Sequence, residues 1–183
     1  MSKQTYVPIL LKLFRQFGYE GVTLSKISEA TGLGKASLYH HFPGGKAEMA
    51  EVALIYVNQW LETHILQILA REDAPLNKFQ SMCDEVNRFF DAGLNSCLWA
   101  VLVLEKSSNT LFHEQICGAF TRWIEAIAAV LTVAGLNETL ARQRGEDAMI
   151  VIQGALILSH VLNDFAPFQR VLQQLPQQLC QGL

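Results

Sequence analysis

Polar residues able to make specific contacts are concentrated in residues 34–42, whose sequence is GKASLYHHF. Only Leu38 and Phe42 are plainly apolar there, and because they are four residues apart they share one face of a helix. The other side chains then face outward or lie along the flanks. Lysine, serine, tyrosine and histidine can all reach phosphate oxygens or base edges, and a small alanine permits close approach. The candidate nucleic-acid contacts on this helix are Lys35, Ala36, Ser37, Tyr39 and His40.

The elements before this stretch would hold it as the second helix of a helix-turn-helix. Apolar residues recur at three- and four-residue steps from Val7 to Phe17, which predicts a first helix that stops at Gly18. Thr23 is a good N-cap for a second helix, which Gly32 would end. Two short helices joined by a glycine-containing turn form a helix-turn-helix, whose second helix lies in the major groove of DNA. Any pair of packed helices could share this spacing, but the polar face favours the DNA-binding interpretation.

The charge of the chain is unevenly distributed. Residues 1–46 contain six basic and two acidic side chains, whereas the other 137 residues contain eight basic and fifteen acidic ones. A basic N-terminal segment on an acidic body indicates a polyanionic partner for that segment alone. Six basic residues in 46 is an ordinary density, so the charge supports the helix-turn-helix interpretation without establishing it.

Residues 13–49 resemble the DNA-binding head of the tetracycline-repressor (TetR) family of transcriptional regulators. The matching positions follow one another in order: Leu13, Phe14, Gly18, Tyr19, Thr23, Ile27, Ala30, Gly32, Lys35, Leu38 to Phe42 and Lys46. The resemblance implies that Thr23 and Lys46 grip phosphates and that Lys35 to His40 face the major groove. Two departures are present. Gly34 stands where the family often has serine or threonine, and the link FPGGKAE is one residue longer than the common pattern.

The remainder of the chain shows helical periodicity throughout, without the alternation typical of strands and without repeats. The expected helices cover residues 47–70, 76–90, 97–105, 111–133, 138–162 and 167–180. The sequence therefore predicts an all-α protein with a three-helix helix-turn-helix head. Together with the resemblance, it predicts a DNA-binding domain over residues 1–46 and a helical ligand-binding and dimerisation domain over residues 47–183.

Small residues in the last two predicted helices lie beside large apolar ones. Gly154, Ala155 and Ser159 belong to this group, and packing within one subunit would explain them equally well. The resemblance implies instead that these helices pair with those of a second subunit in a four-helix bundle. A symmetric dimer is also expected because two heads must meet two half-sites on DNA.

Several aromatic side chains in the body could line a cavity for a small apolar or aromatic effector. Aromatic residues at helical spacing are more often ordinary core, and the family fold supplies the reason to consider a cavity. The candidate ligand-binding residues are Trp60, His64, Phe90, Trp99, Phe112, Phe120 and Trp123. Polar residues on apolar segments could orient a ligand, and they are His64, Gln67, Glu105, His113 and Gln153.

Catalytic signatures are missing from the sequence, which has no G-x-S-x-G elbow, Walker loop or H-E-x-x-H helix. The chain is therefore not expected to be an enzyme or to need a cofactor. His113 and Cys117 could both reach one metal ion, but no third ligand is near them in sequence, so no metal site is expected.

Cysteine chemistry provides the alternative function. Cys97 follows the break GLNS at the start of a helix, where a thiolate is favoured. A thiol-based redox or electrophile sensor that uses Cys97 or Cys117 is therefore a second hypothesis, although a buried structural cysteine is the commoner outcome.

The expected location is the cytoplasm, because the four cysteines are far apart and no secretory signal is visible. No uncharged run reaches about 18 residues, so no membrane span or membrane partner is expected. The leading hypothesis is a dimeric repressor that binds a palindromic operator in double-stranded DNA and is released by a small apolar ligand.

Overall fold

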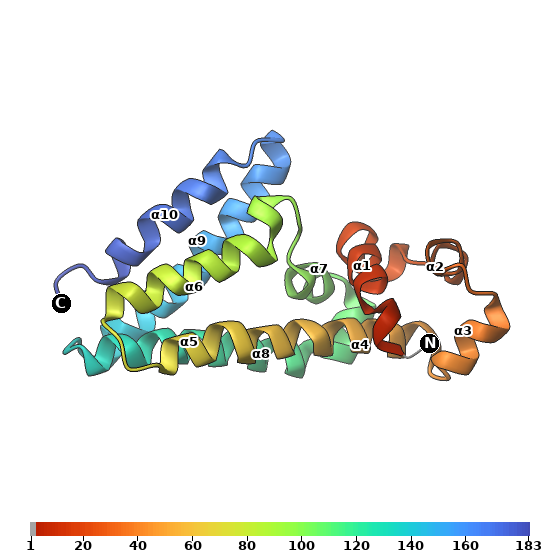
Figure 1. Cartoon of the computed structure of the whole chain (residues 1–183), viewed down its shortest axis with the longest axis horizontal. Helices are drawn as coiled ribbons and strands as arrows, with labels where there is room; N and C mark the ends of the chain where they lie inside the picture. The colour runs from red at the N-terminus through yellow and green to blue at the C-terminus, as the bar shows by residue number, and fades with distance from the viewer. Residues whose placement is uncertain (1–2) are drawn as a thin grey trace. The chain divides into compact units, whose positions relative to one another are not determined.

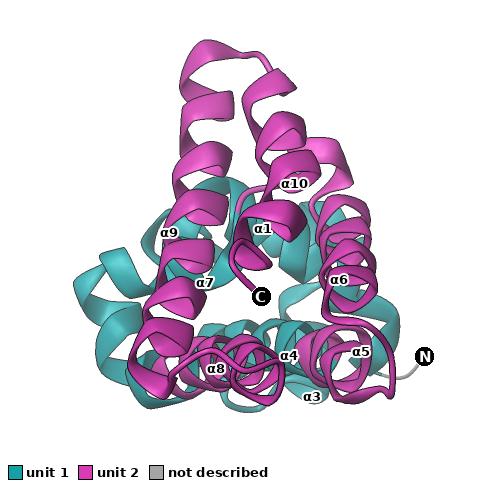
Figure 2. Ribbon diagram, turned by 90° about the vertical axis from the view of Figure 1, so that its left-hand side faces the viewer, with its two compact units in different colours: residues 1–59, 97–116 teal, residues 60–96, 117–183 magenta. Residues whose placement is uncertain are grey.

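The computed structural model describes residues 3–183, and every regular element in that range is helical (Figure 1). This confirms the all-α prediction. The chain divides into two compact units, which Figure 2 shows in different colours. Unit 1 contains residues 1–59 and 97–116, and unit 2 contains residues 60–96 and 117–183. The predicted boundary after residue 46 separates a DNA-binding part from a ligand-binding part, whereas these units are defined by contacts within the fold. The functional boundary stays a prediction.

Unit 1 carries the predicted helix-turn-helix, and most of its helices begin and end near the expected residues. Its elements are η1 (Lys3–Tyr6), α1 (Val7–Gly21), α2 (Leu24–Thr31), α3 (Lys35–His41), α4 (Gly45–Trp60), α7 (Leu98–Leu104) and the first part of α8 (Lys106–Val133). The last residue of α4, Trp60, belongs to unit 2. Leu10, Phe14 and Ile27 are fully buried with Leu38 and Phe42. These five side chains form the core that fixes the first three helices around one another.

Unit 2 consists of longer helices. Its elements are η2 (Leu61–Leu66), α5 (Gln67–Ala70), α6 (Pro75–Phe89), η3 (Asp91–Gly93), the remainder of α8, α9 (Glu138–Leu162) and α10 (Ala166–Leu179). α10 packs against both α6 and α9 (Figures 1 and 2). Asn137 caps α9, since its side-chain oxygen accepts a hydrogen bond from the backbone N–H of Leu140 at 2.9 Å.

Two stretches of the body differ from the predicted helices. The helix expected over 47–70 contains a π-helical segment at Leu61–Leu66. The segment KSSNT, expected as a joint, is the first turn of α8 instead. The Ser108 hydroxyl donates to the Leu102 carbonyl at 2.6 Å and the Thr110 hydroxyl donates to the Lys106 carbonyl at 2.9 Å. Serine and threonine hydroxyls therefore satisfy backbone carbonyls here, which composition alone does not reveal.

Helix α1 is interrupted at Gly18, where the sequence predicts its end. Gly18 has φ 68° and ψ 178°, a conformation that favours glycine, and one further turn follows it. The space beside Gly18 is filled by the carboxylate of Glu105, which also accepts a hydrogen bond from the Glu20 backbone N–H at 2.9 Å. The Ser107 hydroxyl donates to the Glu20 carboxylate at 2.8 Å. Residues 105–107 thus secure the last turn of α1.

Two helices meet a membrane-span criterion that the uncharged runs did not reveal. α8 and α9 contain 18-residue windows of mean hydropathy 1.5 and 1.3, of which 33% and 39% is buried. The prediction of no span rested on uninterrupted uncharged runs, whereas these windows contain up to two charged residues. Such windows are weak evidence for a membrane, because core helices of soluble proteins have the same length and composition.

Candidate nucleic-acid interface

The predicted contact face of α3 is open to solvent. Leu38 and Phe42 are fully buried and anchor the helix, as their spacing predicts. Tyr39 is 49% exposed. The exposed side chains on α3 are Lys35, Ala36, Ser37, Tyr39 and His40, which are the five predicted from the sequence. The structure thus brings these side chains together on one helix, with a polar surface that can approach base edges and phosphates.

The turn between α2 and α3 is fixed by glycine and by two hydroxyls. Gly32 ends α2 in the left-handed conformation, with φ 71°. The Ser28 hydroxyl donates to the Leu33 carbonyl at 2.5 Å, and the Leu33 N–H donates to the Thr31 hydroxyl at 3.3 Å. Gly34 caps α3 without a side-chain hydrogen bond, as expected where serine or threonine is replaced by glycine.

Thr23 occupies the N-cap of α2, as predicted. Its hydroxyl oxygen accepts a hydrogen bond from the Lys26 backbone N–H at 3.2 Å. Because only the oxygen is used in that bond, the hydroxyl proton can still be donated to a phosphate. Lys26 lies beside it, with its ammonium 3.1 Å from the Gly21 carbonyl and 4.3 Å from the centre of the Phe17 ring. A phosphate contact by Thr23 stays a prediction.

Lys46 is half-buried and contacts a residue that the sequence does not pair with it. Its ammonium donates to the Tyr19 carbonyl at 2.9 Å and lies 4.4 Å from the centre of the Tyr19 ring. An ammonium has three N–H donors, so two remain for a phosphate. The contact spans 27 residues of sequence, and local pattern cannot supply it. Burial also raises the pKa of the Tyr19 hydroxyl above its ordinary value.

An acidic side chain near the start of α4 is neutralised by a lysine. The Lys3 ammonium lies 2.5 Å from the Glu48 carboxylate, which also accepts a hydrogen bond from the Gly44 N–H at 2.8 Å. The bond from Lys3 is the main cause of the lowered pKa of Glu48, and the Gly44 bond adds to it. Since Glu48 is paired, it repels a nearby phosphate less than a free carboxylate would.

Three of the candidate ligand-binding residues form an aromatic cluster in unit 2. Trp60 stacks on Phe89, with ring centres 3.8 Å apart, and meets Phe90 and Trp123 edge-on at 6.4 and 6.0 Å. Phe90 and Trp123 are fully buried. Phe89, which adjoins Phe90 in sequence, is the fourth member of this group. We call Trp60, Phe89, Phe90 and Trp123 the aromatic cluster.

Of the other four candidates, two belong to unit 1 and two to unit 2. Trp99 and Phe112 belong to unit 1, where the Trp99 indole donates to Asn58 at 2.9 Å and Phe112 meets Tyr19 edge-on. Phe120 is half-buried in unit 2. His64 is exposed, with its ring nitrogen 2.7 Å from the Thr63 hydroxyl. Helical periodicity predicts which face of a helix a residue occupies. It does not predict which other helices that face packs against, or in which unit they lie.

The predicted dimer helices expose a continuous apolar strip on α9. Its members are Ile150, Val151, Ile157, Leu158, Val161 and Leu162, each at least 36% exposed. Gly154 lies among them, and no atom comes within 4 Å of the position a Cβ would take. Ala155 and Ser159 are buried within unit 2 instead, and Ser159 accepts a hydrogen bond from the Phe168 N–H at 3.3 Å. The alternative of packing within one subunit thus describes Ala155 and Ser159, whereas Gly154 faces solvent.

The cysteines do not favour the thiol-based alternative. Cys97 is buried, and so is Cys83, whose pKa burial raises to about 12. A thiol with such a pKa is protonated at neutral pH and is a poor nucleophile. Of the two candidate sensors, Cys97 is therefore buried and Cys117 exposed, and no disulfide joins any of the four cysteines in the described part of the chain.

Comparison with known proteins identifies the class of this helix-turn-helix and its body. Residues 10–53 match the family described as bacterial regulatory proteins, tetR family. Residues 75–174 match the C-terminal domain of LmrA/YxaF-like transcriptional regulators. The protein is a DNA-binding transcriptional regulator. The chain belongs to the TetR family, with a body of the LmrA/YxaF-like type.

Individual relatives agree over nearly the whole chain. The HTH-type transcriptional regulator YxaF of Bacillus subtilis is 28% identical over 179 residues, which cover 96% of this chain and 93% of that protein. The regulator LmrA of the same organism is 24% identical over 97% of this chain and 96% of its own length. A TetR regulator structure from Legionella pneumophila has the same fold, with a TM-score of 0.84, 18% identity and 97% of each chain covered.

Replacing Tyr39 with alanine should weaken binding to a specific operator by roughly 1–3 kcal/mol, the loss expected when a base or well-placed phosphate contact is removed. Folding should change little because about half of the Tyr39 side chain is exposed. The matched comparison is Lys46→Ala, which should weaken all DNA sequences about equally and reduce the salt slope by about one unit. Titrations of operator and random DNA at several salt concentrations separate the two effects. Unchanged operator affinity in a folded Tyr39/Lys46 double variant would show that this surface does not bind DNA.

Proposed function

We propose that the protein is a homodimeric repressor that binds a palindromic operator through α3 and releases it when a small apolar molecule binds the body. The observation that carries this proposal is the exposed polar face of α3, held on the buried pair Leu38 and Phe42. Residues 1–46 supply the DNA contacts, and residues 47–183 supply dimerisation and effector binding. The direct phosphate contacts are assigned to Thr23 and Lys46.

The apolar strip on α9 supports the homodimer. Family regulators usually act as dimers on operator DNA. Six large apolar side chains on one helix are exposed to water, and an exposed apolar patch of this kind is typical of a protein–protein interface. A second copy of α9 can cover this patch, since a two-fold axis places the same apolar residues opposite one another. Gly154 at the centre of the strip allows the two helices to approach closely.

An apolar effector is supported by the lining of unit 2. A groove of about 280 Å³ is bordered mainly by aliphatic side chains, with Lys78 as its one charged member: Leu66, Leu69, Ala70, Lys78, Ala126, Ala129, Val130 and Val133. The aromatic cluster lies in the same unit and offers ring faces to a flat ligand that displaces one of its members. Shifting a dimer from about 99% to 1% DNA-competent requires roughly 5.5 kcal/mol of differential affinity. Burial of an aromatic effector can contribute much of that amount.

The cytoplasm is the proposed location. Family regulators are soluble DNA-binding proteins, and their operators are in the cytoplasmic compartment of bacteria. On this proposal α8 and α9 are core and interface helices, and their hydropathy reflects burial against protein.

Selection of DNA from a random pool by the purified full-length chain tests the operator proposal. The enriched sequences should contain an inverted repeat, with half-site centres about one helical turn, or a multiple of it, apart. The spacing follows from the two-fold symmetry of a dimer. Enrichment of a single unpaired half-site, or no enrichment at all, would contradict the proposal.

A variant without cysteines should still bind the operator and still respond to a small apolar compound. Cys83 and Cys97 are best replaced by alanine, since a buried hydroxyl would need a partner, and Cys117 and Cys180 by serine. Operator release is measured by fluorescence anisotropy against a panel of apolar aromatic compounds, with the original chain as control. Response to electrophiles alone, lost with the cysteines, would show that the protein is a thiol sensor.

A further inference from the structure

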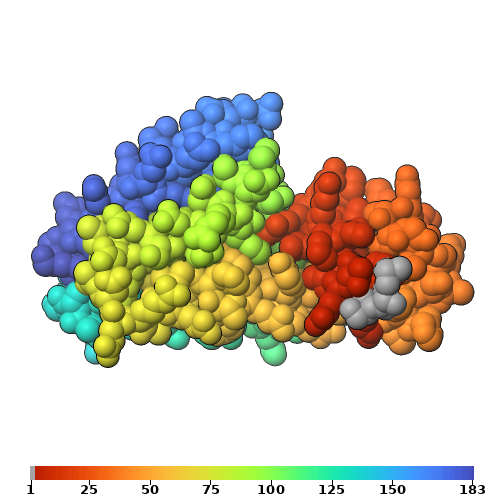
Figure 3. Space-filling model, viewed as in Figure 1, coloured from red at the N-terminus to blue at the C-terminus, as the bar shows by residue number. Residues whose placement is uncertain are grey.

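A groove between α6 and α10 has a different character from the apolar groove of the same unit. The two helices meet along one face of unit 2 (Figure 3). The groove has a volume of about 450 Å³ and is lined by amide side chains on both sides, among them Gln80 and Asn87 from α6 and Gln169 and Gln173 from α10. Such a volume accommodates a small organic molecule.

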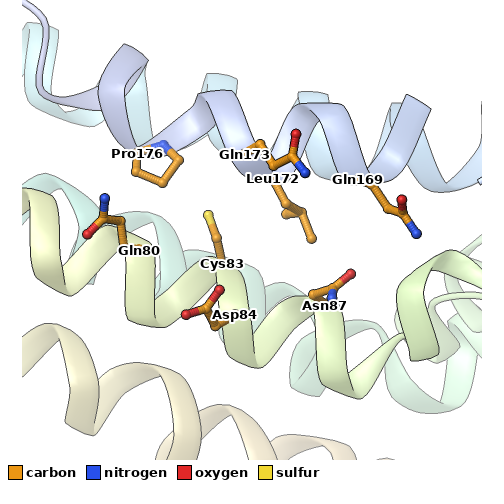
Figure 4. A pocket seen from close by; sticks show the side chains of 8 residues that line it. All are labelled: Gln80, Cys83, Asp84, Asn87, Gln169, Leu172, Gln173 and Pro176. Atoms are coloured by element: carbon orange, nitrogen blue, oxygen red, sulfur yellow. The ribbon is translucent and has the colours of Figure 1, made fainter. Parts of the chain in front are cut away.

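The groove contains a polar atom with no partner. The side-chain oxygen of Asn87 is buried and accepts no hydrogen bond from any part of the chain that the structure describes. Figure 4 shows the Asn87 amide directed from α6 into the space below α10, on the side of Gln169. A buried acceptor without a donor costs free energy, and a ligand that donates a hydrogen bond there would recover it.

A second acceptor follows from the proline inside α10. Pro176 has no N–H, so it cannot donate to the carbonyl of Leu172, four residues earlier. Both residues line the groove. The Leu172 carbonyl is thus left without its ordinary helical donor.

The charge of the lining defines the ligand further. Asp84 is the one formally charged side chain among the described residues that border the groove, and no ion pair involving it is formed by residues 3–183. Cys83 points from α6 towards α10 in Figure 4, and its thiol stays neutral because burial raises its pKa to about 12. Leu172 and Pro176 provide an apolar wall beside these acceptors.

We propose that this groove binds a small aromatic amine, whose ammonium pairs with Asp84 and whose ring lies against Leu172 and Pro176. The remaining donors of the ligand reach the Asn87 oxygen and the Leu172 carbonyl. Hydrogen-bond acceptors and one carboxylate border the groove beside apolar side chains. A ligand that carries both a positive charge and an aromatic ring would match this combination. This site is separate from the apolar groove and the aromatic cluster, and it does not depend on which molecule releases the operator.

The test compares tyramine with tyrosol, which differ only in having an ammonium or a hydroxyl group. Each is titrated into the full-length protein while backbone amide NMR signals and binding heat are recorded. Tyramine should bind saturably, with shifts concentrated on α6 and α10, and about tenfold more tightly than tyrosol, as a charge-assisted hydrogen bond to Asp84 predicts.

Two variants of acidic residues in unit 2 provide the matched comparison. Asp84→Asn should lower tyramine affinity about tenfold and leave tyrosol unchanged, whereas Glu72→Gln removes the same charge from an exposed residue outside the groove and should change neither. Thermal melting checks that both variants are folded. The proposal is overturned if tyramine causes no saturable shifts at the groove, or if the two variants weaken tyramine equally, which would indicate general electrostatic attraction.

Discussion

Arginine in place of Gly154 is expected to convert the proposed dimer into monomers and to lower operator affinity at least about a hundredfold. A buried charge without a partner costs roughly 3–5 kcal/mol, and at a two-fold interface the cost arises on both subunits. A single subunit should still fold, since the position is open and no atom lies within 4 Å of a Cβ there. Sedimentation velocity measures the oligomeric state, and operator titration measures the consequence for DNA binding.

Gly154→Ala is the matched control for this arginine variant. It adds one methyl group to the same open position and should leave the dimer intact. Ala155→Arg is a poorer test, because Ala155 is only 6% exposed and arginine there would disrupt the core of its own subunit. A stable dimer of the Gly154→Arg protein that still binds its operator would place the subunit interface on another surface.

The second large effect is expected in the aromatic cluster. Trp123→Ala should lower the free energy of unfolding by roughly 3–5 kcal/mol, as for other large-to-small changes of buried aromatic residues. Trp123 is fully buried, lies 6.0 Å from the Trp60 ring and donates its indole N–H to the sulfur of Met82 at 3.4 Å. Denaturant unfolding at one fixed protein concentration is the appropriate measurement, since the proposed dimerisation would make stability concentration-dependent.

Trp123→Phe keeps a ring in place and should cost much less than the alanine change. A cavity left by the indole is apolar, and such cavities bind small aromatic molecules. Added indole should therefore raise the melting temperature of Trp123→Ala but not that of the original chain. Equal stability of the alanine and phenylalanine variants would show that Trp123 is not a packing centre of unit 2.

The head was largely predictable because its determinants are local. The N-cap at Thr23, the left-handed Gly32 and the four-residue spacing of Leu38 and Phe42 each act within one or two turns of helix. The exposure of the α3 side chains follows from that spacing. Position within a helix therefore predicted the candidate interface residue by residue.

Long-range contacts in unit 1 could not be obtained in this way. The bond between Lys46 and Tyr19 joins residues 27 apart, and the bond between Glu105 and Glu20 joins residues 85 apart. Glu105 was interpreted as a polar residue that could orient a ligand, yet its carboxylate binds the backbone of α1. Nothing in its sequence neighbourhood distinguishes those two roles.

Burial on the body helices was predictable only in part. Both Gly154 and Ala155 are small residues among large apolar ones, and one turns towards solvent while the other packs in the core. Adjacent residues on a helix are about 100° apart, so small size alone does not assign a face. The same limitation explains why the aromatic candidates of the effector site are divided between the two units.

The fit between Gly18 and Glu105 limits how this DNA-binding head can be transplanted. A Cβ at position 18 would lie 1.8 Å from the Glu105 carboxylate, in a backbone conformation that side chains rarely adopt. Residue 18 must therefore lack a side chain as long as Glu105 occupies the space beside it. A substitution at either position changes which residues the other position tolerates. A chimaera cut after residue 46 would leave Glu105 behind and expose both the hollow beside Gly18 and the N–H of Glu20. The compact unit that carries the helix-turn-helix is discontinuous in sequence, since it includes residues 97–116 as well as the N-terminal helices.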